Sequence, residues 1–196
     1  MLPHALPVHR DSLARPTQVE NPQKPAVCAA FLLEHNCLMA APRAPRLIIV
    51  CGLPGSGKTT FAKHLETTLR AIRFSADDWL KALLINIYDE EKRAKIESLQ
   101  WELAQQLLAN GQIVIIEWGT WGRSERDGLR LGARALGAAA ELHYLHASVD
   151  ELFARIHRRA MEDPPIERDA VERWFRQFQA PTPEEIALFD EPLVRT

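Results

Sequence analysis

One octapeptide in this sequence combines residue types and spacing that suit it to bind phosphate. Gly52-Leu53-Pro54-Gly55-Ser56-Gly57-Lys58-Thr59 follows the pattern G-x-x-x-x-G-K-[ST] of a P-loop. Its glycines let the backbone turn tightly and bring amide N–H groups to phosphate oxygens. Lys58 supplies a mobile positive charge for the β- and γ-phosphates, and the Thr59 hydroxyl suits a magnesium ion. We therefore predict that the protein binds ATP and Mg²⁺, with nucleotide contacts from Gly52, Leu53, Pro54, Gly55, Ser56, Gly57, Lys58, Thr59 and Thr60.

Two acidic residues, Asp77 and Asp78, follow the second predicted strand. Phosphoryl transfer to a hydroxyl needs a carboxylate that orients the attacking oxygen and takes its proton. We assign Asp77 to this role as the catalytic base. The alternative is helix capping, in which Ser75 or Asp77 is the N-cap and Asp78 closes a capping box or favours the helix dipole.

A third acid, Glu117, ends an apolar strand, the position of a Walker-B acid. In this role Glu117 would hold a magnesium-bound water or polarise the acceptor, so Thr59 and Glu117 are the predicted metal-site residues. The alternative is an ordinary carboxylate at the end of a strand.

Two arginines, Arg155 and Arg159, are spaced i and i+4 and therefore share one face of a predicted helix. Pro164-Pro165 follows and suggests a mobile segment, so we interpret this helix as a lid whose arginines close over the transferred phosphate. The alternative is a solvated basic face paired with Glu151 or Glu162. Two other arginines, Arg123 and Arg126, suit either the binding of acceptor or phosphate or a position on the surface.

Aromatic and histidine residues near the same strand ends are expected to be structural. Trp79, Trp118 and Trp121 cluster there, and packing is favoured over stacking on an acceptor. His143 and His146 lie on a predicted strand without metal-ligand partners of familiar spacing.

Apolar runs of strand length alternate with helical patterns, which predicts a parallel sheet with right-handed crossovers. In the second long helix, Ile96, Leu99, Leu103 and Leu107 are expected to form the buried stripe. The fold class is α/β, a three-layer α/β/α P-loop NTPase fold with a mostly parallel sheet of four to five strands. Predicted strands are 46–51, 71–75, 112–117 and 140–147, and predicted helices are about 60–69, 77–88, 89–110, 123–137, 149–161 and 167–179.

Residues 1–45 differ from the rest, because they hold seven of the thirteen prolines and no sustained periodicity. We predict a disordered leader, with a short helix near 26–34, before a single domain over 46–196. Met39 is a candidate natural start. The net charge of −2 disfavours a protein that wraps nucleic acid, and three unpaired cysteines suit a reducing compartment. With no apolar run of membrane-spanning length, we expect a cytoplasmic protein.

Together, the P-loop, the Asp77-Asp78 pair, the acid at 117 and the spaced arginines resemble the small P-loop kinases. The most similar types are the bacteriophage polynucleotide kinase domain, chloramphenicol phosphotransferase, the zeta toxins and the bacterial ATP-binding proteins of the AAA type. The resemblance covers about residues 46–180. It implies that Lys58 and Thr59 serve phosphate and magnesium, that Asp77 is the base, and that Arg159, with Arg155, is the lid arginine.

This sequence departs from that pattern at two positions. Glu117 stands where aspartate is usual, and Leu80 stands where polynucleotide kinase has an arginine for the substrate phosphate. We therefore expect an ATP-dependent kinase whose acceptor is a hydroxyl-bearing small molecule or a nucleotide, and we do not favour a polynucleotide. The alternative is an ATP-binding switch module that acts through a protein partner, which the sequence does not name.

Overall fold

The computed structural model describes residues 44–159 and 165–194. Residues 1–43, which include almost all of the predicted leader with its short helix and Met39, lie outside the described part. So do 160–164, with Pro164. The described residues form four strands and seven helices: β1 (Arg46–Cys51), α2 (Lys58–Leu69), β2 (Ile72–Phe74), α3 (Ala76–Ala82), α4 (Glu90–Ala109), β3 (Ile113–Gly119), α5 (Arg123–Ala135), β4 (Ala139–Tyr144), α6 (Val149–Arg159), α7 (Arg168–Gln177) and α8 (Pro183–Ile186).

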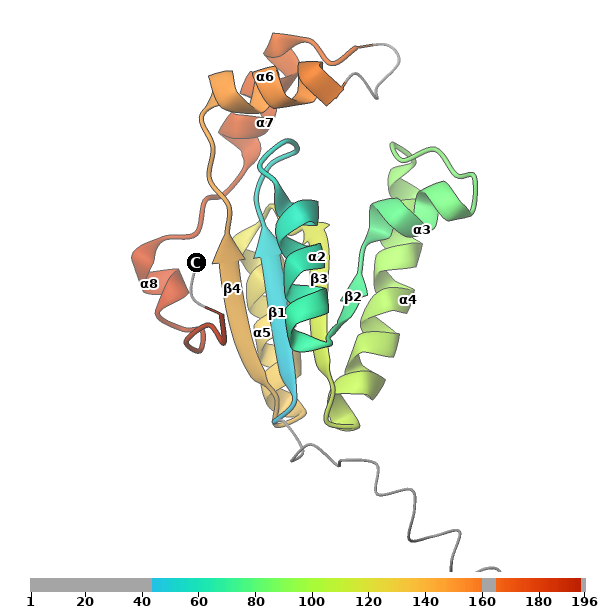
Figure 1. Ribbon diagram of the computed structural model, residues 1–196, viewed down its shortest axis with the longest axis vertical. Coiled ribbons are helices and arrows are strands. Elements are labelled where there is room, and N and C mark those ends of the chain that lie inside the picture. The colour runs from blue at the N-terminus through green and yellow to red at the C-terminus, as the bar shows by residue number, and fades with distance from the viewer. Residues whose placement is uncertain (1–43, 160–164, 195–196) are drawn as a thin grey trace, which may run out of the picture. The chain divides into compact units, whose positions relative to one another are not determined.

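The four strands form one parallel sheet in the order β2-β3-β1-β4, which confirms the predicted α/β fold. The two central strands, β1 and β3, are almost wholly buried because both of their faces are covered. Helix α2 covers one face, and α4 and α5 cover the other (Figure 1). Because all strands run the same way, their carboxyl ends meet at one edge of the sheet, the usual place for a ligand site.

The buried side of α4 is shifted by one position from the predicted stripe. The buried residues are Ile96, Gln100, Ala104 and Leu108, whereas Leu99 is 48% exposed. Gln100 is accommodated because its amide donates to the Ser75 carbonyl, at 3.1 Å, and accepts from the Trp118 indole, at 2.6 Å. Both partners lie at the carboxyl edge of the sheet, so the burial of a polar residue ties α4 to that edge.

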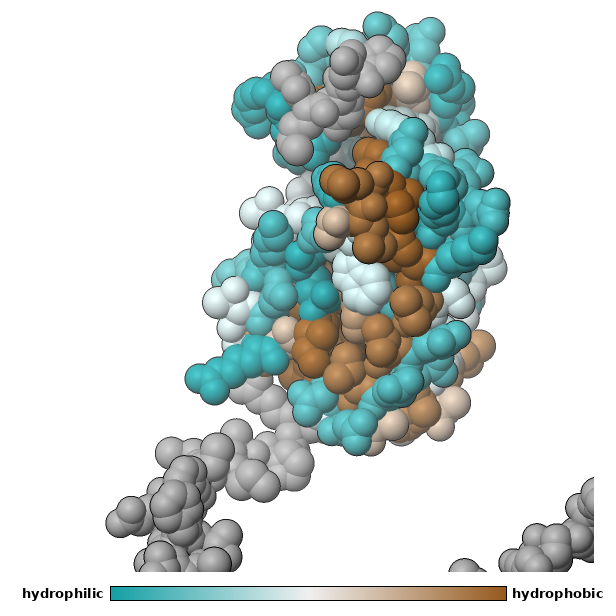
Figure 2. Space-filling view, turned by 90° about the vertical axis from the view of Figure 1, so that its right-hand side faces the viewer, coloured by the Kyte–Doolittle hydropathy of each residue, from teal (hydrophilic) through white to brown (hydrophobic). Residues whose placement is uncertain are grey.

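Helix α3 also differs from its prediction, since it ends at Ala82 and not near Tyr88. Leu84 has φ +57°, and the Ile85 amide donates to the Leu80 carbonyl, which closes the helix. Leu83 and Leu84 therefore become exposed. The face of the molecule that carries β2, α3 and α4 has an apolar band that is bordered by polar residues (Figure 2).

Candidate active site

The P-loop is packed beneath the end of β4 and against α6. Gly52 has φ +144°, and a Cβ there would lie 2.5 Å from the Leu145 carbonyl oxygen. Gly55 has φ +84°, and its Cβ would lie 3.1 Å from Ile156 on α6. Both positions require glycine, because a side chain would meet backbone or packed neighbours in a backbone conformation that already disfavours one.

Helix α2 begins at Lys58, directly after the P-loop, so its positive dipole end faces the loop. Lys58 Nζ donates to the Leu53 carbonyl at 3.0 Å. Burial lowers the pKa of the Lys58 ammonium below its ordinary value, and the charges of Glu117 and Asp77 oppose this effect. Both acids line the same cleft as Lys58.

The sequence-predicted site residues largely converge on one cleft of about 1100 Å³ at the carboxyl edge of the sheet. Three P-loop residues, Gly52, Leu53 and Ser56, are buried beneath the loop and do not line the cleft. The predicted residues that line it are Pro54, Gly55, Gly57, Lys58, Thr59, Thr60, Asp77, Glu117, Arg155 and Arg159.

Glu117 lies beside the P-loop threonine. The Thr59 hydroxyl donates a short hydrogen bond to Glu117 Oε1, and Arg73 Nη1 donates to Oε2 at 2.8 Å. A hydroxyl and a carboxylate side by side are the hard oxygen donors that Mg²⁺ prefers, so these two residues fit the predicted metal site. The described residues contain no cluster of three or more acidic, histidine or cysteine side chains that could hold a metal alone. A metal here would take its remaining ligands from phosphate and water.

The two adjacent aspartates have different partners and different surroundings. Asp78 accepts from Arg73 Nη2 at 2.6 Å, and its backbone N–H donates to the Ser75 hydroxyl, which caps α3. Asp77 lines the cleft and accepts from Arg93 Nη2 on α4. Ser75 thus performs the capping that was the alternative role, and Asp77, unlike Asp78, lines the cleft.

Helix α6 presents its arginines to the cleft and its apolar side to the P-loop. Leu152 and Ile156 are buried on α6, while Arg155, Arg158 and Arg159 line the cleft. Arg155 Nη1 approaches the Gly55 carbonyl at 3.5 Å and Nη2 approaches Glu151 at 3.7 Å. Arg155 therefore lines the cleft and also makes the alternative contact with Glu151.

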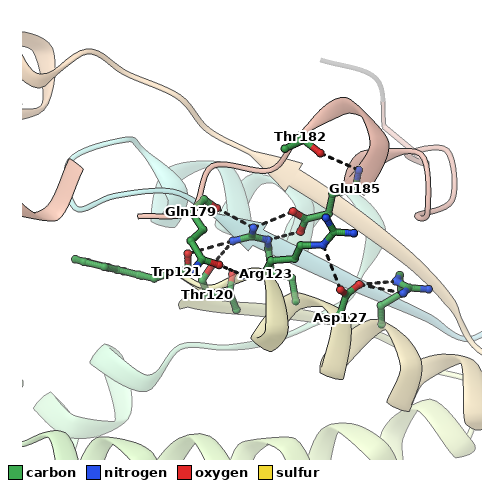
Figure 3. Close-up of polar contacts among 9 residues, drawn as sticks. Thr120, Trp121, Arg123, Asp127, Gln179, Thr182 and Glu185 are labelled. Carbon is green, nitrogen blue, oxygen red and sulfur yellow. Dashed lines mark hydrogen bonds and ion pairs between the residues drawn. The ribbon is translucent and has the colours of Figure 1, made fainter. Parts of the chain in front are cut away.

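Arg126 has neither of its predicted roles. It is fully buried and forms a two-point ion pair with Glu185, which is 1% exposed, at 2.6 and 3.0 Å. Its remaining N–H groups donate to the carbonyls of Thr120, Trp121 and Gln179. These contacts join the turn after β3 to the segment that follows α7 (Figure 3). Arg126 therefore holds Thr120 and Trp121, which line the cleft, but does not itself line it.

The three tryptophans Trp79, Trp118 and Trp121 all pack against the buried core, as expected. Trp118 and Trp121 also line the cleft. Trp121 also makes edge contacts with Trp174 and Phe178, 6.5 and 6.4 Å away. His143 is buried and contacts Glu141 at 3.1 Å, which agrees with a structural role.

Two arginines of the site, Arg73 and Arg93, were not identified from the sequence. Arg73 binds Glu66, Asp78 and Glu117 from within β2. An arginine inside a short predicted strand was the available signal, because such a residue seldom enters a sheet without an acidic partner. Arg93 offered no comparable signal, because only the packing of α4 beside α3 brings it to Asp77.

Comparison with known proteins supports the family and the fold of this chain. A family model described as an AAA domain matches residues 47–181. A gluconokinase from Sinorhizobium meliloti 1021 is 22% identical with a TM-score of 0.52, over 72% of this chain and 79% of its own. Chaetomium thermophilum Kti12, solved with ADP-AlF3, is 23% identical with a TM-score of 0.55, over 70% and 82%. A chain of the Pnkp1/Rnl/Hen1 RNA repair complex is 24% identical with a TM-score of 0.58, over 71% and 46%. At these identities the structural matches establish a shared P-loop kinase-like fold.

Proposed function

The chain belongs to the AAA domain family, and on this premise we propose that it is an ATP-dependent phosphotransferase acting on a hydroxyl group. The observation that carries the proposal is that Lys58, Asp77 and Glu117 line one cleft, with α6 arginines beside them. The gluconokinase and a sugar kinase from Janibacter among the structural neighbours support a kinase, and the ADP-AlF3 bound to Kti12 supports a nucleotide in this fold.

In the proposed reaction the acceptor oxygen attacks the γ-phosphorus of ATP while its proton passes to Asp77. The bond between the γ-phosphorus and the β,γ-bridging oxygen breaks, and ADP leaves with the electron pair. Arg93 contacts Oδ1 of Asp77, so Oδ2 is the oxygen that accepts the proton. Lys58 and the α6 arginines stabilise the charge that develops on the phosphoryl oxygens.

Thr59 and Glu117 would hold Mg²⁺, Thr59 through its hydroxyl and Glu117 through its carboxylate. When bound, the ion neutralises phosphate charge. Arg73 keeps the Glu117 carboxylate in place by its bond to Oε2.

The test is to measure ADP formation and phosphate incorporation together, with Mg²⁺-ATP and a panel of hydroxyl compounds. A kinase forms ADP and phosphorylated acceptor in equal amounts, and Asp77→Asn abolishes both while ATP still binds. A switch module that acts through a partner protein would instead show slow ATP hydrolysis that no acceptor accelerates. That result would reject the phosphotransferase proposal.

A further inference from the structure

The cleft extends well beyond the P-loop. At about 1100 Å³ it exceeds the roughly 300–1,000 Å³ typical of a pocket for one ligand. Besides the P-loop and α6, its lining includes residues of α4 and α5, and we call this part of the cleft the second compartment. This second compartment is lined by Glu97, Ser98 and Trp101 on α4 and by Ser124, Glu125 and Gly128 on α5.

Two glycines one turn apart on α5 shape this compartment. A Cβ at Gly132 would lie 2.5 Å from Trp101 Cζ2, so the missing side chain lets the indole lie against α5. A Cβ at Gly128 would meet nothing within 4 Å. On α5, Trp101 therefore packs against Gly132, and the space beside Gly128 is open. An indole beside such a space is a surface against which a ligand can pack.

Thr120 is a buried residue in the wall of the same cleft. It is 4% exposed, lines the cleft, and its Oγ1 has no hydrogen-bond partner among the described residues. Its φ is +39°, a conformation that costs energy for a β-branched residue. The Arg126 bond to the Thr120 carbonyl, at 2.9 Å, holds this conformation. A buried hydroxyl without a partner is unfavourable in the free protein, and a ligand that bonds to it removes that cost.

The two charged residues among the six that line this compartment, Glu97 and Glu125, are both acidic. Arg93, which also lines the cleft, is shared between Asp77 and Glu97. Burial raises the pKa of Glu97, Arg93 opposes this, and Glu125 and Asp77 add to the rise. A second cation next to Glu97 would therefore stabilise its ionised form, whereas an anionic group would add repulsion.

We propose that the compartment between α4 and α5 is the acceptor site and that the acceptor is a hydroxyl compound with a basic amine. Glu97 and Glu125 hold the ammonium group, the Thr120 hydroxyl bonds to the acceptor, and the reacting hydroxyl points to Asp77. This inference rests on the proposed phosphotransferase function. It disfavours an acceptor whose phosphate group would lie against Glu97 and Glu125.

The charge of the acceptor is tested with two matched trios: glucosamine, glucose and gluconate, and ethanolamine, ethylene glycol and glycolate. Phosphate incorporation from ATP is measured for each. We expect the amine to exceed the other members of at least one trio by about tenfold or more in kcat/KM. Transfer that favours a neutral or anionic member, with Asp77→Asn inactive, would retain the kinase and reject the amine. No transfer to any amine would also reject it.

The location is tested with Gly128→Leu, whose added side chain fills the open space over α5. The acceptor KM should rise about tenfold or more while the Kd for ATP stays the same. Ala135→Leu adds similar bulk at an exposed position of the same helix, away from the cleft, and is the matched control. Glu125→Gln should reduce the preference for the amine within a trio. An unchanged KM in Gly128→Leu, with the variant folded by circular dichroism, would place the acceptor elsewhere.

Discussion

The hydroxyl of Thr59 and the carboxylate of Glu117 are joined by a direct hydrogen bond, although 58 positions separate them in the sequence. One lies at the start of α2 and the other near the carboxyl end of β3, the strand beside β1. The parallel sheet brings these two elements together. The bond places an acid next to the P-loop threonine, where a nucleotide-bound Mg²⁺ would be held.

Replacing this acid should change the Mg²⁺ dependence of turnover more than it changes the affinity for ATP. In Glu117→Gln we expect the Mg²⁺ concentration for half-maximal turnover to rise about 10- to 100-fold, because an amide oxygen carries no charge. Glu66→Gln is a matched control, since Glu66 also binds Arg73 but lies outside the cleft. Equal Mg²⁺ dependence in the two variants would remove Glu117 from the metal site.

The adjacent aspartates allow a direct test of the base. Asp77→Asn should lower kcat by about 10²–10⁴-fold with the Kd for ATP retained, because the amide cannot take the acceptor proton. Asp78→Asn leaves Asp77 in place and weakens an ion pair with Arg73, so its effect on kcat should be much smaller. Single-turnover phosphate transfer measures both. A larger loss in Asp78→Asn would show that the assignment is reversed.

Features of the site that follow from neighbouring residues in the sequence could be predicted, whereas features that depend on tertiary contacts could not. The P-loop is contiguous, and the residues next to it follow from strand and helix patterns, so the common location of Lys58, Asp77 and Glu117 could be predicted from the sequence. The buried side of α4 could not, because hydropathy does not predict that Gln100 is buried by bonds to Ser75 and Trp118.

The tertiary partners of buried or cleft-lining charged residues also could not be predicted from the sequence. Arg126 and Glu185 are 59 positions apart, and neither position carries a local pattern that predicts burial. Only the return of the chain from α7 to the turn after β3 pairs them. Arg93 reaches Asp77 for a similar reason, through the packing of α4 beside α3.

ATP binding should change the protonation of Lys58. Burial lowers the pKa of this ammonium in the free protein, and phosphate oxygens beside it would raise the pKa again. Binding should therefore take up protons at alkaline pH and weaken as pH rises. Calorimetry at pH 9 in two buffers of different ionisation enthalpy measures this uptake.

Lys58→Met should abolish the proton uptake and weaken ATP binding by roughly tenfold or more. The control is Lys63→Met, an exposed lysine on α2 outside the cleft, which should bind ATP like the wild type. Buffer-dependent enthalpies that persist in Lys58→Met would assign the proton to another group.

Cys51, at the end of β1, should make the free energy of unfolding depend on pH in the alkaline range. Burial raises the pKa of its thiol from 9.0 to about 12. The unfolded chain therefore releases this proton first, so the contribution is complete below pH 9 and is lost as pH rises toward 12. From pH 8 to pH 10 the free energy of unfolding should fall by about 1.4 kcal/mol from this group.

Urea unfolding of the wild type and of Cys51→Ala at both pH values isolates the effect. The lost packing of the variant is the same at each pH, and Tyr144, whose pKa is also raised by burial, is present in both proteins. The difference between the two proteins should therefore shrink by about 1.4 kcal/mol at pH 10. A constant difference would mean that the thiol ionises equally in both states.

The buried ion pair behind the turn after β3 should be costly to break from either side. Arg126→Leu leaves the Glu185 carboxylate buried without its partner, and Glu185→Leu does the same to the guanidinium. Each variant should lose about 3–5 kcal/mol in the free energy of unfolding. The double variant should lose less than the sum, because no unpaired charge remains, although three carbonyls lose their donor.

The same pair should influence acceptor binding, because Arg126 holds the Thr120 carbonyl and the strained φ at that residue. Thr120→Gly relieves the strain, so we expect it to unfold at a higher urea concentration but to show a higher acceptor KM, since the hydroxyl is gone and the turn is freer. Thr120→Ser keeps the hydroxyl and should retain the KM. If Thr120→Gly gains stability without any change in the acceptor KM, then the turn at Thr120 does not contribute to acceptor binding. Arg126 would then have a purely structural role.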